Sequence, residues 1–154
     1  IEAVCVLTNT SGKINGYILF KEDLKKKDTI IELHLKNVPK GSHGFHIHRT
    51  GDLREGCSSL CSHYNPHNKN HGGPDSKERH VGDLGNIKSV NGTVNKTMRD
   101  KLIRLRGKYS VIGRSVVIHS DKDDLGLGGD AESLKTGNAG KRIACGVIGY
   151  SKNC

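Results

Sequence analysis

Apolar and polar residues alternate along several short stretches of the chain, and turn residues separate these stretches. The clearest example is residues 29–36, where Ile31, Leu33 and Leu35 alternate with polar side chains. A period of two places the apolar side chains on one face of a β-strand. The same pattern, or a short apolar run between turn residues, predicts strands at 2–8, 17–20, 29–36, 45–48, 84–87, 94–106, 115–119 and 142–150.

Two long segments lack this periodicity. Residues 49–82 are rich in Asn, Gly, Pro and Ser, and residues 120–141 are rich in Gly, Asp, Asn and Lys, with one short helical turn predicted at 131–134. The 20 glycines and the 4% content of aromatic residues favour strands and turns over helices. The length indicates a single domain over residues 1–154. We therefore predict an all-β fold, an eight-stranded antiparallel Greek-key barrel or sandwich of the immunoglobulin-like kind with two long functional loops.

Histidine and aspartate gather in and beside the first of these segments. His46 and His48 are two residues apart on a predicted strand, so both imidazoles point to one face while Phe45 and Ile47 point into the core. Neutral imidazole nitrogens and carboxylate oxygens are ligands for zinc and copper. The candidate ligands are His46, His48, His63, His71, His80, Asp83 and His119. A structural zinc site needs only four ligands, so this larger set predicts two metals.

A lone histidine is more often a surface residue or a core residue than a metal ligand. We interpret His34, His43 and His67 in this way. His43 lies beside the strand pair and could support the site through a hydrogen bond.

Several motifs make the chain similar to copper/zinc superoxide dismutase over nearly its whole length. They lie at residues 44–48 (GFHIH), 65–66, 71–74 (HGGP), 79–86 (RHVGDLGN), 112–114, 123–126, 135–140 and 144–149. The resemblance implies antioxidant defence by dismutation of superoxide to dioxygen and hydrogen peroxide. It also implies two cofactors, with one redox-cycling copper and one structural zinc in each subunit.

The resemblance implies a role for each candidate residue. It assigns copper to His46, His48, His63 and His119, and zinc to His63, His71, His80 and Asp83. His63 would be a bridging imidazolate that takes up a proton during turnover, and Arg142 would dock the superoxide anion. Asp123 would join the two sites by accepting hydrogen bonds from one histidine of each. A disulfide between Cys57 and Cys145 would tie the first loop to the last strand.

The chain departs from the family's pattern at a few positions. Arg49 and Thr50 stand where an acid and a phenylalanine are usual, residues 60–62 lack a common proline, and Leu127 and Leu134 replace polar residues. None of these changes removes a ligand.

Five cysteines are an odd number, so at least one is unpaired or bonded to another chain. Cys5, in an apolar strand, is interpreted as a small buried hydrophobe. Cys61 and Cys154 are outside the family's pattern, and free thiols, a second bridge or an intermolecular link stay open for them.

Positive charge is concentrated in one part of the chain. The net charge is +9, and residues 88–119 contain eight Lys and Arg side chains against one Asp. General basicity attracts any anion, superoxide included. For residues 88–114 we favour a solvated basic edge strand, which resists edge-to-edge aggregation, over the binding of nucleic acid or a glycan. The sequence shows no aromatic platform on which bases would stack.

Partners and location follow from the resemblance. It implies a twofold homodimer formed through Gly51, residues 112–113 and the last strand near Ile148, with a copper chaperone as a further partner. No run is apolar enough to span a membrane, and no signal-like segment is visible, so we expect the cytoplasm, with secretion as the alternative. Glycosylation sequons begin at Asn9, Asn91 and Asn95.

Two competing functions keep the same fold. A metal-carrying protein would bind copper without turnover, but it has no use for an anion-docking arginine at position 142. A basic nucleic-acid or glycan binder would use its metals only for structure.

Overall fold

The computed structural model describes residues 1–153, and within them it contains nine β-strands and one short 3₁₀ helix. In chain order these are β1 (Glu2–Val6), β2 (Asn9–Thr10), β3 (Asn15–Asp23), β4 (Asp28–Lys36), β5 (Gly41–His48), η1 (Gly56–Leu60), β6 (Asp83–Ser89), β7 (Val94–Asp100), β8 (Ser115–His119) and β9 (Arg142–Tyr150). Cys154, whose pairing the sequence leaves open, lies outside the described residues.

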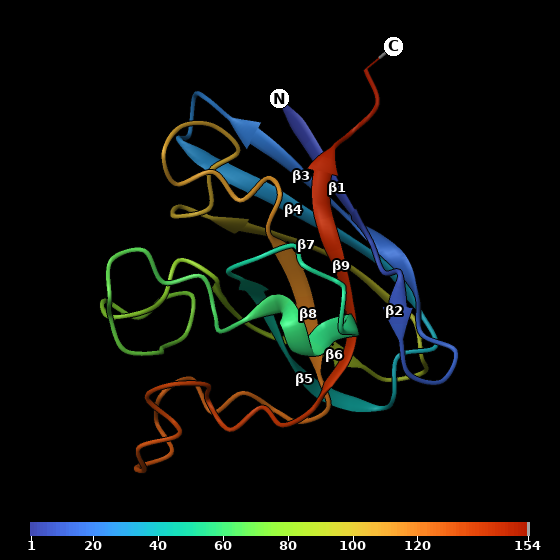
Figure 1. Ribbon diagram of the computed structural model, residues 1–154, viewed down its shortest axis with the longest axis vertical. Helices are drawn as coiled ribbons and strands as arrows, with labels where there is room; N and C mark the ends of the chain where they lie inside the picture. Colours follow the sequence, from blue (N-terminus) through green and yellow to red (C-terminus); the bar gives the residue numbers. More distant parts are fainter. Residues whose placement is uncertain (154) are drawn as a thin grey trace.

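Eight of these strands form one antiparallel path in the order β6-β5-β8-β9-β1-β3-β4-β7, and the short β2 pairs with β9. Strands β6 and β7 follow each other in the chain but stand at opposite ends of the path, so the sheet curls into a nearly closed barrel (Figure 1). Neighbours that are distant in sequence, such as β5 and β8, give the Greek-key connectivity. The all-β prediction is therefore confirmed. No helix within residues 1–153 has the length and apolar character needed to cross a membrane.

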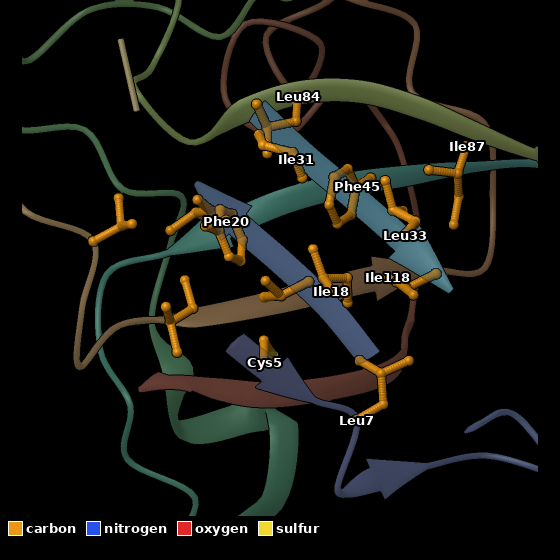
Figure 2. Packing of buried hydrophobic residues seen from close by; sticks show 14 of the residues in the cluster. Cys5, Leu7, Ile18, Phe20, Ile31, Leu33, Phe45, Leu84, Ile87 and Ile118 are labelled. Carbon is orange, nitrogen blue, oxygen red and sulfur yellow. The ribbon is translucent and has the colours of Figure 1, made fainter. Parts of the chain in front are cut away.

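The hydrophobic core fills the inside of the barrel. Ile31 and Leu33 of β4 are buried, as the alternation predicts, and they meet Phe20 from β3 and Phe45 from β5 (Figure 2). Burial of one such side chain contributes about 1.5–3 kcal/mol. The barrel is therefore a packed scaffold on which the loops are mounted.

Three predicted elements are different in the structure. The strand expected at 94–106 ends at Asp100, because the Asp100 carboxylate accepts hydrogen bonds from the amides of Leu102 and Ile103 and turns the chain. The helical turn expected at 131–134 is a series of turns in which the amides of Lys135 and Thr136 share one carbonyl oxygen. The first strand is also shorter than 2–8, since the chain breaks and re-forms as β2.

The two long loops leave the barrel on the same side, on the left in Figure 1. The first of them, residues 49–82, contains η1 and is joined to β9 by the disulfide Cys57–Cys145, which agrees with the family resemblance. Cys5 is buried and unpaired, and Cys61 is an exposed thiol with no partner within residues 1–153. The barrel therefore presents both loops to one end, and the disulfide fixes the first of them there.

Candidate metal centre

Strand β5 places the first two histidines. It alternates as expected, with Phe45 and Ile47 in the core and His46 and His48 buried on the opposite face. In the neighbouring β8, the pairing with β9 shifts register just before His119. Such an irregularity re-aims a side chain, and the His119 ring lies 4.7 Å from that of His46 between ring centroids.

Two groups of side chains bring their ligand atoms together. The first consists of His46, His48, His63 and His119, and the second consists of His63, His71, His80 and Asp83. Within each group the ligand atoms lie within 4.8 Å of one another, and all of these side chains are buried. The seven predicted ligands therefore form two adjoining sites that share His63.

Asp83 is the centre of the second group. Its Oδ2 atom accepts hydrogen bonds from the amides of Gly72 and His80, at 3.0 and 2.7 Å. Its Oδ1 atom is thereby turned toward the histidines, 3.0 Å from Nδ1 of His63 and 2.8 Å from Nδ1 of His71. Burial alone would raise the pKa of Asp83, but these imidazoles lower that pKa far below its usual range.

His63 reaches both groups with its two ring nitrogens. Nδ1 lies 3.2 Å from Nδ1 of His80 in the second group. Nε2 is buried and has no hydrogen-bond partner, and the ring is 4.0 Å from the ring of His46 between centroids. His63 is thus a member of both groups and presents one ring nitrogen to each.

Buried nitrogens without partners test whether these groups fit metals. Nδ1 of His46 and Nε2 of His63 have no hydrogen bond within residues 1–153, and Nδ1 of His71 has only the Asp83 Oδ1 atom nearby, at 2.8 Å but without hydrogen-bond alignment. A buried polar atom in this state costs about 1–3 kcal/mol. All three belong to the two groups, and a metal ion in each group would satisfy them. The donor set, imidazoles plus one carboxylate, suits copper and zinc.

Asp123 connects the two groups from behind. Its carboxylate accepts a hydrogen bond from Nε2 of His46 at 2.6 Å and another from Nε2 of His71 at 2.8 Å. The Asn86 side chain holds the Asp123 backbone, and a side chain at Gly137 would collide with the Asp123 carboxylate. Each ring therefore turns its Nδ1 toward a ligand group.

Burial sets the protonation of most of these histidines. It lowers the pKa of His46 and His48 well below the usual value, and it lowers the pKa of His119 to about 4. These rings are neutral at pH 7, which is the form that binds a metal. His71 is different, because the flanking carboxylates of Asp123 and Asp83 outweigh its burial and raise its pKa to about 9.

A pocket of about 400 Å³ opens over the first group, and its lining includes His48, His63 and His119 together with Glu132, Lys135 and Arg142. The Arg142 guanidinium donates hydrogen bonds to the carbonyl oxygens of Cys57, at 2.8 Å, and Cys61, at 2.7 Å. An arginine held in this way presents a fixed positive charge at the entrance to the site.

Backbone atoms add contacts that the sequence analysis missed. Nδ1 of His48 lies 2.7 Å from the Cys61 carbonyl oxygen, and Nδ1 of His119 lies 3.2 Å from that of Gly140. His43 supports the site as expected, since its Nδ1 lies 2.8 Å from the carbonyl oxygen of His119. No side-chain pattern signals a carbonyl acceptor, so only the structure could reveal the first two.

Comparison with known proteins agrees with this geometry. A family model described as copper/zinc superoxide dismutase matches residues 14–148. The chain belongs to the copper/zinc superoxide dismutase family. It is 53% identical over 154 residues to a Cu-Zn superoxide dismutase of Paramecium bursaria Chlorella virus 1, covering 99% of this chain and 80% of the relative. It is 49% identical over 150 residues to a Cu-Zn superoxide dismutase of Xenopus laevis, covering 97% and 98%.

A third relative is named an extracellular Cu-Zn superoxide dismutase, from Brugia pahangi, and is 50% identical over 153 residues that cover 97% of this chain and 76% of the relative. Dismutation of superoxide is the function of the family, and copper and zinc are its cofactors. The two histidine groups of this copper/zinc superoxide dismutase fit those ions.

Proposed function

We propose that the first group holds copper, the second holds zinc, and His63 bridges the two ions. The observation that supports this assignment is the set of buried ring nitrogens that lack partners and belong to the two groups. Copper would supply one-electron exchange with superoxide, which zinc cannot do. Residues 1–154 would form a single domain with this one activity.

The chain's own residues would handle the anion and the proton. Arg142 would dock superoxide, because its guanidinium stays charged and lines the pocket above His48, His63 and His119. Nε2 of His63 would hold the proton that is passed to the departing peroxide. Asp123 would act as a positioning residue, since it hydrogen-bonds a histidine of each group.

Replacing Arg142 with alanine tests this function. We expect the dismutation rate constant of the copper- and zinc-loaded protein to fall about tenfold or more, because the fixed charge that captures the anion is lost. Stopped-flow decay of superoxide measures this rate, and the metal content is determined on the same samples.

Arg106→Ala is the matched control, since Arg106 is exposed and pairs with Glu22 rather than lining the metal pocket. It removes the same charge and should leave the rate near that of the parent protein. If both variants lose the same fraction of the rate, Arg142 contributes only to the net charge of the protein and has no specific role in docking superoxide. A fully loaded parent protein with no dismutation above free copper would instead indicate a metal carrier.

Zinc binding at pH 7 is expected to release about one proton, because the pKa of about 9 keeps His71 protonated in the metal-free protein. Protons compete with zinc below that pKa, so zinc affinity should rise with pH up to about 9. Calorimetry in two buffers of different ionisation enthalpy counts the protons. Asp123→Asn removes one flanking carboxylate and should reduce the count. Zinc binding without proton release would contradict this assignment of His71.

We also propose a homodimer formed through the surface at Gly51 and Gly113. The Gly113 amide donates to the carbonyl oxygen of Ile148 at 2.8 Å, and Gly51 lies against the carbonyl group of Gly113. The Ile148 side chain is itself in the core, so its partly exposed neighbours Val147 and Gly149 would make the contact from β9. Sedimentation velocity distinguishes dimer from monomer.

Delivery of copper by a chaperone stays a prediction of the resemblance.

We propose the cytoplasm as the location, with secretion as the alternative, and the family resemblance is the support. The sequon residues Asn91 and Asn95 are exposed on and beside β7. Both are accessible to glycosylation in a protein that passes through a eukaryotic secretory pathway. Glycans on protein isolated from its natural source would therefore indicate secretion.

A further inference from the structure

The loop between β7 and β8, residues 101–114, lies on the left-hand side of the barrel in Figure 1, as does the first long loop, and the two meet where Tyr109 approaches His67. Two hollows lie at this meeting, one of about 740 Å³ and one of about 350 Å³. His67 lines the larger hollow and Tyr109 lines the smaller one, and their rings are 4.7 Å apart between centroids. The two hollows therefore form one continuous surface, called here the basic surface. It shares no lining residue with the pocket over the first histidine group.

Positive charge dominates the basic surface. Eight Lys and Arg residues and three Asp residues line the two hollows, a net charge of +5 out of +9 for the chain. Two of the three carboxylates are already neutralised, since Asp100 pairs with Arg79 and Asp28 pairs with Arg99. More than half of the chain's excess charge thus lies on one face.

Most of these cations have no acidic partner among the described residues, although the Arg114 guanidinium donates to the carbonyl oxygens of Arg49 and Ser110. Within residues 1–153, no ion pair is formed by Arg49, Lys69, Lys77, Lys101, Lys108 or Arg114. The smaller hollow has no acidic residue among those that line it. Free cations of this density attract a partner with regularly repeated negative charges.

Aromatic side chains lie among these cations, which the sequence did not make apparent. Tyr109 is 37% exposed, and Nζ of Lys108 lies 5.7 Å from the centre of its ring. The Arg114 guanidinium covers the buried ring of Tyr64 at 3.8 Å. Unpaired bases stack on aromatic rings and on guanidinium planes, whereas a sulfated glycan needs only the charges.

We propose that the basic surface binds single-stranded nucleic acid. Lys101 in the larger hollow and Lys108 in the smaller one contact successive parts of the phosphate backbone, and Tyr109 stacks against a base. The site lies outside the pocket over the first histidine group, so it is a second binding function of the enzyme. The proposed dimer surface is next to Arg49 and Arg114 in the chain, and the test therefore relies on Lys101, Lys108 and Tyr109.

The test measures fluorescence anisotropy of a labelled short oligothymidylate with the copper- and zinc-loaded protein at increasing salt. Lys101→Glu/Lys108→Glu should weaken binding on the order of tenfold. It should also lower the slope of log affinity against log salt by about 1.4, at about 0.7 for each phosphate that the protein no longer neutralises. The matched control is Lys13→Glu/Lys36→Glu, which makes the same charge change far from the hollows. Lys36 ends β4 at the end remote from Asp28, and the carbonyl oxygen of Lys13 accepts a hydrogen bond from the next residue, Asn37. Equal weakening by both variants, or no binding by the parent protein at low salt, overturns the proposal.

Tyr109 distinguishes nucleic acid from a sulfated glycan. Tyr109→Leu should weaken oligothymidylate binding about fivefold or more, because it removes the aromatic ring. Tyr109→Phe keeps the ring and should bind the oligonucleotide as well as the parent protein does. Neither substitution should alter binding of dextran sulfate. Dismutation should be unchanged in the two Tyr109 variants, because Tyr109 does not line the pocket over the metals and its replacement leaves the net charge as it was. The two double lysine variants should change it equally, because they change the net charge equally. If Tyr109→Leu has no effect and dextran sulfate binds as well as the oligonucleotide, the surface recognises only charge and the nucleic-acid proposal is wrong.

Discussion

Replacing Cys57 with serine is expected to lower the free energy of unfolding of the metal-free protein by about 4–5 kcal/mol. The disulfide joins residues 88 positions apart, and closing so long a loop removes much of the unfolded chain's conformational entropy. Cys145 would remain as a small buried thiol, so no cavity is added to the core. Urea unfolding monitored by circular dichroism measures the loss. Cys61→Ser, at an exposed free thiol, is the control and should leave stability close to that of the parent.

The same change should reduce dismutation, because the disulfide anchors the segment that holds Arg142. The guanidinium of Arg142 donates to the carbonyl oxygens of Cys57, which lies within η1, and Cys61, which directly follows it. A loosened segment would let the guanidinium move away from the pocket while the metal ligands stay in place. We expect the rate constant per copper to fall and its dependence on salt to weaken. A stable Cys57→Ser protein with full activity would contradict both the anchoring and the entropy argument.

The strands could be predicted where burial imposes a period of two. Residues 29–36 read as a strand and form one, because every second side chain fills the barrel. The strand predicted at 94–106 ends early, at Asp100. The Asp100 carboxylate turns the chain there and also pairs with Arg79 from a distant loop, and the pattern of apolar and polar residues contains no sign of either interaction. Interactions between distant segments set that boundary, so local sequence could not place it.

The metal centre could be predicted better than the surface around it. The His-x-His pair on β5 and the three loop histidines gave five of the seven members of the two groups, and Asp83 and His119 were the other two predicted ligands. The basic surface escaped prediction because Tyr109 and His67 are 42 positions apart and meet only when two loops fold together. A charge count located the cations, but only the structure showed that they enclose hollows.

Arg79 is a buried cation that the motif contains and to which the sequence analysis gave no role. Its side chain and that of Asp100 are only 5% and 2% exposed, and Nη1 of Arg79 lies 2.7 Å from Oδ2 of Asp100. The guanidinium also donates to the carbonyl oxygens of Pro74, His80 and Val81. One side chain thus ties the loop segment that contains His80 to the end of β7.

Arg79→Met is therefore expected to lower the free energy of unfolding by roughly 3–5 kcal/mol, because it leaves the Asp100 carboxylate buried and unpaired. Asp100→Asn removes that charge, so the same Arg79 substitution should cost less in an Asp100→Asn background. Urea unfolding of the four metal-free proteins gives the coupling energy. Arg99→Met is the matched control and should cost far less, because Arg99 makes its ion pairs at the surface.

Zinc affinity provides a second readout of the Arg79 contacts. Without the guanidinium, the carbonyl groups of Pro74, His80 and Val81 lose their donor, and the loop must be ordered again when zinc binds to His80. Zinc should therefore bind more weakly to Arg79→Met than to Arg99→Met, even under conditions where both proteins are folded. If the two variants bind zinc equally and unfold at the same urea concentration, Arg79 neither secures the barrel nor shapes the second histidine group.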